Sequence, residues 1–187
     1  MLLSALGKGL IAGAAGTTAL NAATYADMAL RGRPASDTPE RTVETLAEQA
    51  GHPVPGEGEK RDARLTGLGS LSGLVTGVGV GAAAGLLHPV LTRLPTLASA
   101  VLVGAGVMAA TDVSMIKLGV TDPSSWSASD WASDAAPHLV YGAVTVWTLQ
   151  LLSRTEHRAA NKAAGKAASK AARQATRAAK REARTQG

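Results

Sequence analysis

The chain has 187 residues and a net charge of +5, which allows one domain or a small helical bundle. The absence of Cys excludes disulfides, thiolate nucleophiles and cysteine metal sites. With three Trp, two Tyr and no Phe, core volume must come from Ala, Leu, Val and Gly. This composition suits close contact between helices better than a globular interior.

The first predicted element is a membrane helix within residues 1–30. Residues 9–26 carry no formal charge, and these 18 residues just reach the length that spans the hydrocarbon core of a bilayer. A stripe of small or polar residues recurs at every fourth position, at Gly9, Gly13, Thr17 and Asn21. A signal peptide would carry positive charge before the apolar run, and residues 1–7 have only the amino terminus. Whether this segment is cleaved is left open.

Residues 31–63 are predicted to form a polar loop with one amphipathic helix at 39–50. A helix start is indicated by Asp37 with Glu40, or by Thr38 followed by Pro39. Apolar residues then recur with helical spacing at Val43, Leu46, Ala47 and Ala50. Gly51 ends the pattern, and we expect the helix to lie on the membrane surface or on the bundle.

The chain is organised around the 28 uncharged residues between Arg64 and Arg93. Glycine recurs there at every fourth position, at Gly69, Gly73, Gly77, Gly81 and Gly85. In water each glycine within a helix costs about 0.5–1 kcal/mol relative to alanine, whereas in lipid a glycine stripe forms a groove that receives another helix. We predict a second span at 64–88 whose groove receives a helix of the same chain. Self-association into a homo-oligomer is the alternative.

Two further spans are predicted at residues 94–117 and 136–154, each with an uncharged run of 18 or 19 residues. The intervening segment 118–135 is predicted as a loop with three Asp and no base. Its Trp126 and Trp131 suit an interfacial aromatic belt. The expected fold class is therefore all-α, a polytopic membrane bundle of about four transmembrane helices.

The tail, residues 155–187, is predicted as a basic helix on an alanine background. From Arg154 onward ten Lys/Arg stand against two Glu, so the basicity belongs to this region. The candidate residues for binding an anionic surface are Arg158, Lys162, Lys166, Lys170, Arg173, Arg177, Arg181 and Arg184. Anionic lipid headgroups or an acidic protein are the predicted partners. Nucleic acid would be bound without sequence specificity, because no aromatic residue interleaves the bases. A solvated helix without a partner is the alternative.

The charge distribution predicts the topology. Four spans put both termini on one side, and the basic tail indicates that this side is the cytoplasm. The five Lys/Arg within 31–63 oppose this orientation, so the side of that loop is left open. We expect a multi-pass protein of a bacterial inner membrane.

Polar residues gather where the predicted spans meet the outer leaflet. Ionisable groups inside membranes usually face the bundle interior in pairs. Asp27, Asp112 and His138 would form a proton or cation site with Arg64 as counter-charge, or else these groups cap helix ends and tie the bundle together. The predicted polar membrane cluster comprises Asn21, Tyr25, Asp27, Arg64, Asp112, His138 and Tyr141.

No catalytic or cofactor motif is evident. The four histidines lack metal-ligand spacing, no serine lies in a nucleophile elbow, and no phosphate-binding loop follows a strand. We expect no enzymatic activity, metal or cofactor. The favoured function is a structural or interaction role in a membrane through the basic tail. The alternative is a small ion- or proton-coupled transporter or channel-like protein that uses the outer-leaflet Asp/His cluster.

Three segments in order read GLIAGAAGTTALNAATYADMAL, SDTPERTVETLA and HLVYGAVTV. This order resembles small uncharacterised multi-span bacterial inner-membrane proteins of the YagU-like family. The resemblance implies a fold and a location and no established activity. It gives weight to His138, Tyr141 and Gly142 as packing or site residues.

Overall fold

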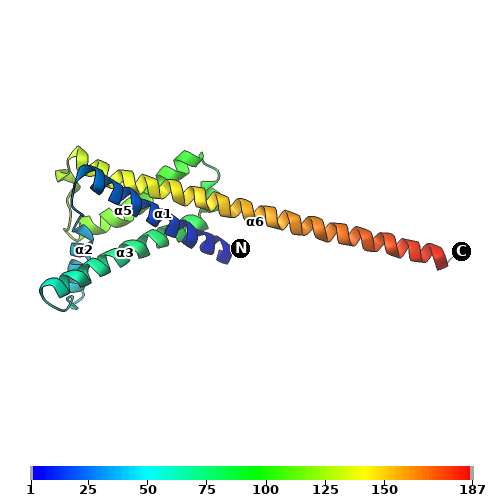
Figure 1. Ribbon diagram of the computed structural model, residues 1–187, viewed down its shortest axis with the longest axis horizontal. Coiled ribbons are helices and arrows are strands. Elements are labelled where there is room, and N and C mark those ends of the chain that lie inside the picture. The colour runs from blue at the N-terminus through cyan, green and yellow to red at the C-terminus, as the bar shows by residue number, and fades with distance from the viewer. Residues whose placement is uncertain (1, 186–187) are drawn as a thin grey trace. The chain divides into compact units, whose positions relative to one another are not determined.

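A computed structural model describes residues 2–185, without the side chains of His157 and residues 175–185. Within these residues all regular elements are helical, which confirms the predicted all-α class (Figure 1). The elements are α1 (Leu2–Arg31), α2 (Thr38–Gln49), α3 (Gly58–Leu86), α4 (His88–Leu91), α5 (Thr96–Lys117), the 3₁₀ helix η1 (Pro123–Ser125) and α6 (Ala128–Thr185). The chain divides into two compact units, Met1–Leu149 and Gln150–Gly187, and each is described by itself.

Two of the described helices, α3 and α5, are long and apolar enough to cross a membrane by length and composition. Only 22% of the most apolar part of α3 and 28% of that of α5 is buried within the protein. Most apolar side chains of both helices therefore face outward. α1 and α6 do not reach the same hydropathy. α1 is rich in Gly, Ala and Thr, and the start of α6 contains His138 and Gln150.

The observed helix boundaries follow local signals. α2 begins at Thr38 with Pro39 in its first turn, although the Asp37 side chain makes no cap hydrogen bond. Gly51 after α2 has φ of 73°, the left-handed conformation that favours glycine at a helix end. α3 ends at Leu86, and the short helix α4 begins at His88 with Pro89 in its first turn, where proline is favoured.

The prediction of a loop over 118–135 is wrong for its second half, because α6 already begins at Ala128. The Asp130 carboxylate accepts hydrogen bonds from the Ser127 amide and hydroxyl, and the Ser127 hydroxyl in turn accepts from the Asp130 amide. This reciprocal arrangement is a capping box, which satisfies amides at a helix start that have no partner within the helix. It begins the helix well before the apolar run.

α1 and α3 pack through their glycines. A Cβ at Gly9 would lie 2.6 Å from the Gly81 carbonyl oxygen, and a Cβ at Gly13 would lie 2.8 Å from that of Gly77. A Cβ at Gly81 would collide with the Gly13 backbone. No side chain fits between the helices here, so their backbones touch directly.

The five glycines of the α3 stripe do not share one partner. Gly77, Gly81 and Gly85 face α1, whereas Gly69 faces Pro39 of α2. Gly73 has no heavy atom within 4 Å of an added Cβ, apart from its own helix backbone and chain neighbours. The groove within this chain is therefore formed by the carboxyl-terminal half of the stripe.

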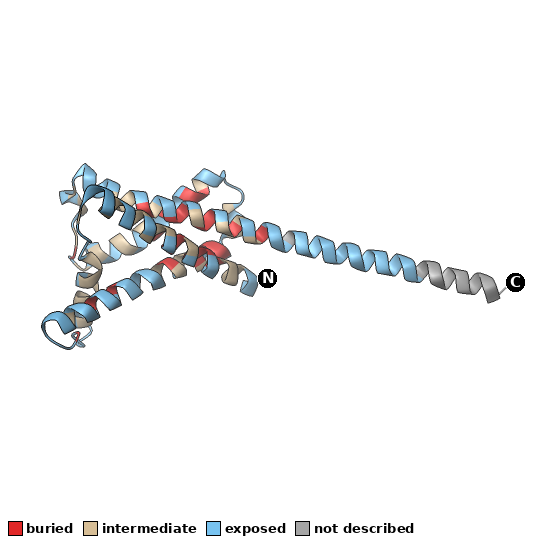
Figure 2. Cartoon of the chain, viewed as in Figure 1, coloured by how far each residue is buried: buried red, intermediate tan, exposed pale blue. Residues whose placement is uncertain are grey.

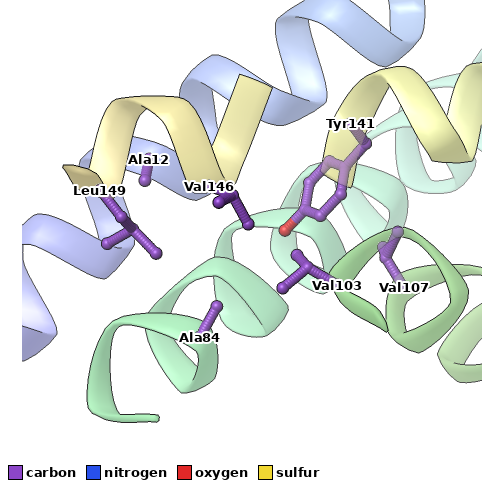
Figure 3. Close-up of a cluster of buried hydrophobic side chains, with 7 residues drawn as sticks. All are labelled: Ala12, Ala84, Val103, Val107, Tyr141, Val146 and Leu149. Carbon is purple, nitrogen blue, oxygen red and sulfur yellow. The ribbon is translucent and has the colours of Figure 1, made fainter. Parts of the chain in front are cut away.

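The core of residues 1–149 is centred on Tyr141, which is completely buried (Figure 3). Its hydroxyl donates a hydrogen bond to the Gly77 carbonyl oxygen of α3 at 2.6 Å. Gly16 of α1 leaves room for the Tyr141 ring, because a Cβ there would lie 2.9 Å from the ring. The clustered buried side chains are Ala12, Ala84, Val103, Val107, Tyr141, Val146 and Leu149. Figure 2 shows the buried residues concentrated in α1, α3, α5 and the first part of α6.

Candidate functional site

A cavity of about 430 Å³ lies among α1, α5, the start of α6 and the segment that follows α1. Apolar side chains of Leu20, Met115 and Trp126 form part of its lining. The Trp126 ring meets Trp131 edge-on, with 5.0 Å between ring centroids. The charged and histidine residues of the lining are Arg31, Arg33, Asp112, Asp130, Asp134 and His138. The cavity is thus apolar in part and contains groups of both charges.

Three titratable side chains from two helices meet in this cavity. Asp112 of α5 and Asp134 of α6 lie close enough for their carboxyl groups to interact. His138 lies one helical turn after Asp134, with Nδ1 2.7 Å from the Asp134 carbonyl oxygen and 3.4 Å from Asp134 Oδ1. We name Asp112 and Asp134 the carboxyl pair.

The two acids of the carboxyl pair influence each other's titration. Two ionised carboxylates at short distance repel, so their proximity favours the protonated form of one of them. Burial raises the pKa of Asp134 to about 6; His138 opposes this rise and Asp112 adds to it. Asp134 Oδ2 is buried without a hydrogen-bond donor from the described chain.

Asp27 pairs with Arg31 and Arg33, the two arginines that line the cavity. Its carboxylate accepts hydrogen bonds from Arg33 and, at 3.3 Å, from Arg31. Arg31 also donates to the hydroxyls of Ser129 and Ser133, so the end of α1 is tied to the start of α6. The counter-charges of Asp27 therefore come from the segment directly after it in the chain.

Arg64 lies elsewhere, although the sequence hypothesis gave it the counter-charge role. Its guanidinium donates to the Pro55 carbonyl oxygen. It lines a separate, mainly apolar groove between α2 and α3 with Val43, Val54 and Leu68. The position of Arg64 five residues before Gly69 carried no information about this partner.

Of the remaining predicted polar residues, some line the cavity and others do not. Asn21 and Tyr25 do not line the cavity, and 64% of Tyr25 is exposed. Tyr141 lies in the core. Asp112 and His138 do line the cavity, together with Asp134, which the sequence interpretation left in a solvated loop. Two signals indicate Asp134: the four-residue spacing to His138, and the Ser127–Asp130 capping box that makes this segment helical.

Residues 2–185, as far as their side chains are described, contain no group of three His, Asp or Glu side chains arranged to hold one metal ion. The carboxyl pair and His138 are protonatable groups that line the same cavity.

The basic tail is a second candidate surface. Residues 158–174 are exposed at every position along α6. They include Arg158, Lys162, Lys166, Lys170 and Arg173, which recur every three or four residues and so share one broad side of the helix. The side chains of Arg177, Arg181 and Arg184 lie outside the described residues.

No family model, curated protein sequence or solved structure matches this chain.

Proposed function

We propose that this chain is an integral membrane protein whose basic carboxyl-terminal helix binds an anionic lipid surface. The membrane part is supported by α3 and α5, whose apolar residues are mostly exposed. Leu71 is 57% exposed and Val75 is 73% exposed, both on α3. Contiguous apolar surface of this kind is unfavourable in water and neutral toward lipid chains.

The observation that carries the tail's role is its composition, on a helix whose residues 158–174 are all exposed. Between Arg154 and the end of the chain alanine is the only aliphatic residue, so the tail has no anchor for insertion into a bilayer. Charge is the only strong interaction that it offers. Near an anionic membrane each Lys or Arg contributes about 1 kcal/mol. Five regularly spaced bases on the described part are enough for stable but salt-sensitive binding.

We further propose four spans, formed by α1, α3, α5 and the first part of α6, with both termini in the cytoplasm of a bacterial cell. Both units then contact the membrane, one by insertion and one by charge. The YagU-like resemblance agrees with this topology and stays a prediction. Single cysteines at Ala128 and Ala168, both exposed, can be labelled in intact cells with an impermeant maleimide. Labelling of Ala128→Cys alone supports the topology, and labelling of Ala168→Cys contradicts it.

The tail's role is tested with the full chain in phosphatidylcholine nanodiscs. Vesicles that contain phosphatidylglycerol are expected to bind, and vesicles of phosphatidylcholine alone are not. Replacement of Arg158, Lys162, Lys166, Lys170 and Arg173 by Gln removes five of the ten Lys and Arg residues from Arg154 onward and should weaken binding strongly. A matched variant with Ala159, Ala163, Ala167 and Ala171 replaced by Gln should retain it. Binding should weaken steeply with added salt.

Two results would contradict the lipid role. One is equal binding by the Lys/Arg variant. The other is binding of short duplex DNA without binding of anionic vesicles, which would assign the tail to nucleic acid.

A second function, coupled movement of protons or cations, is favoured by the cavity with its carboxyl pair. In proteoliposomes, Asp112→Asn should abolish a pH-dependent flux while the protein stays folded. No flux from the wild-type chain would reject this second function and leave the tail's role untouched.

A further inference from the structure

The groove between α2 and the first half of α3 is large enough to hold a ligand. Its volume is about 480 Å³, and small-molecule sites have volumes of about 300–1,000 Å³. Arg64, Leu68 and Leu71 line its α3 side, and their spacing of four and three residues puts them on one face of the helix. Val43 and Ala47, one turn apart, line its α2 side. The groove is therefore a mainly apolar channel with one arginine.

Two contacts hold α2 against α3 beside this groove. A Cβ at Gly69 would lie 3.1 Å from the Pro39 carbonyl carbon, so the backbones are close there. The Arg61 guanidinium pairs with the Glu44 carboxylate at 2.6 Å. Gly67 lines the groove, and a Cβ there would meet no heavy atom within 4 Å outside its own helix backbone and chain neighbours. The space over Gly67 is thus open between two helices that are fixed to each other.

Arg64 provides positive charge at this groove. Its Nη1 donates to the Pro55 carbonyl oxygen, which uses one of the five N–H donors of the guanidinium. Among the ion pairs of the described residues none includes Arg64, whereas Arg61, one turn earlier, has Glu44 as its partner. The lining of the groove contains no Asp or Glu. The remaining donors can bind a phosphate group through two parallel hydrogen bonds, the geometry that a guanidinium favours.

The order of charged and apolar groups along the groove matches that of a phospholipid. Arg64 is the last charged residue before the 28 uncharged residues of the chain's central stretch. At 1.5 Å per residue, Leu68 and Leu71 lie about 6 and 10 Å further along α3. The headgroup region on each side of a bilayer is only about 5–8 Å thick. When α3 is inserted, Arg64 therefore lies at the level of the phosphates and the two leucines lie at the level of the acyl chains.

We propose that this groove binds one phospholipid with a net negative headgroup. Arg64 holds the phosphate, and one acyl chain lies along Leu68 and Leu71 against α2. A zwitterionic lipid has a phosphate too, but its ammonium group places a second positive charge near Arg64 and weakens binding. This inference rests on the proposed insertion of α3 into a membrane and does not depend on the basic tail.

The site is tested with photoreactive lipids and the full chain in phosphatidylcholine nanodiscs. The nanodiscs contain a small fraction of either phosphatidylglycerol or phosphatidylcholine with a diazirine near the start of one acyl chain. After irradiation, the labelled residues are identified by mass spectrometry of peptides. Labelling of residues 65–71 should be at least about fivefold greater with phosphatidylglycerol, the factor expected from one base near an anionic headgroup.

Two pairs of variants assign the labelling to the groove. Arg64→Gln should make the two lipids label residues 65–71 equally, whereas Lys60→Gln, which removes an exposed base outside the lining, should change nothing. Gly67→Leu puts a side chain into the groove and should reduce the labelling of Val43 and Ala47 by phosphatidylglycerol to the level of phosphatidylcholine. Gly73→Leu is its matched control, because a Cβ there also meets open space but Gly73 does not line the groove.

The possible failures of this proposal and of the proposed function can be told apart at Val75, an α3 residue that is 73% exposed and outside the groove lining. Equal labelling of residues 65–71 by both lipids, with Val75 labelled, would overturn the groove and leave α3 in the membrane. A difference that survives Arg64→Gln, or disappears in Lys60→Gln, would also overturn it. If neither lipid labels Val75 or residues 65–71, the insertion of α3 is wrong and the groove proposal fails with it.

Discussion

Residues 1–149 contain two kinds of contact between helices, which differ in whether side chains lie between the backbones. At Gly13 and Gly81, and again at Gly104 and Gly142, the backbones touch and no side chain lies between them. At Asp112 and Asp134 two acidic side chains from different helices lie close together beside a cavity. Backbone contact has one arrangement and is insensitive to solvent conditions. The interaction of two neighbouring acids depends on pH, because they repel strongly only when both are ionised.

The largest effect is expected from closing the space at a glycine contact. Gly81→Ala places a methyl group against the Gly13 backbone, which cannot move aside without separating α1 from α3. The free energy of unfolding in detergent should fall by about 2–3 kcal/mol. Gly73→Ala is the matched control, because its Cβ would meet open space, and it should be neutral or slightly stabilising. Equal loss in both variants would mean that α3 is sensitive to any substitution and not to this contact.

A smaller effect is expected from the carboxyl pair, and it depends on pH. The pKa of Asp134 in the folded chain, about 6, lies above its ordinary value of 3.8, so the folded state binds this proton more tightly than the unfolded state. The stabilisation is complete below about pH 4 and is lost as the pH rises through about 6. Asp134→Asn should remove this dependence and stabilise the protein at about pH 7.5 by about 1–2 kcal/mol, after allowance for partial exposure.

Asp130→Asn provides the control for that titration. Hydrogen bonds from the Ser127 hydroxyl and amide hold the pKa of Asp130 below its ordinary range, so this acid stays ionised throughout the interval. Denaturation curves of the control variant between about pH 5 and pH 7.5 should keep the slope of the wild type. A wild-type stability that does not change with pH there would contradict the role of Asp134.

The smallest effect is expected at Tyr141. Tyr141→Phe keeps the ring in the core and removes the hydrogen bond to the Gly77 carbonyl oxygen, which should cost about 1 kcal/mol. Tyr25→Phe, at a position 64% exposed, should change the unfolding free energy by less than about 0.5 kcal/mol. If the two variants unfold alike, the bond that joins α6 to α3 contributes no net stability.

Residues close together in the chain determined the secondary structure. The Thr38-Pro39 start and the Gly51 end were both predictable, because each acts on its own backbone or on a neighbouring one. The early start of α6 was also a local signal, a capping box of Ser127 and Asp130 that the sequence interpretation missed. A stripe of glycines on α3 likewise predicted close packing without its partner.

Only the tertiary structure decided which groups meet. It divided the α3 glycines between α1 and α2, put Arg64 beside Pro55, and brought Asp134 close to Asp112. Spacing along a helix determines which residues share a face. It does not determine which face of another helix lies opposite, or in what register. That choice is made by backbone contacts at a few small residues far apart in sequence, such as Gly104 and Gly142, and these contacts bring the carboxyl pair together.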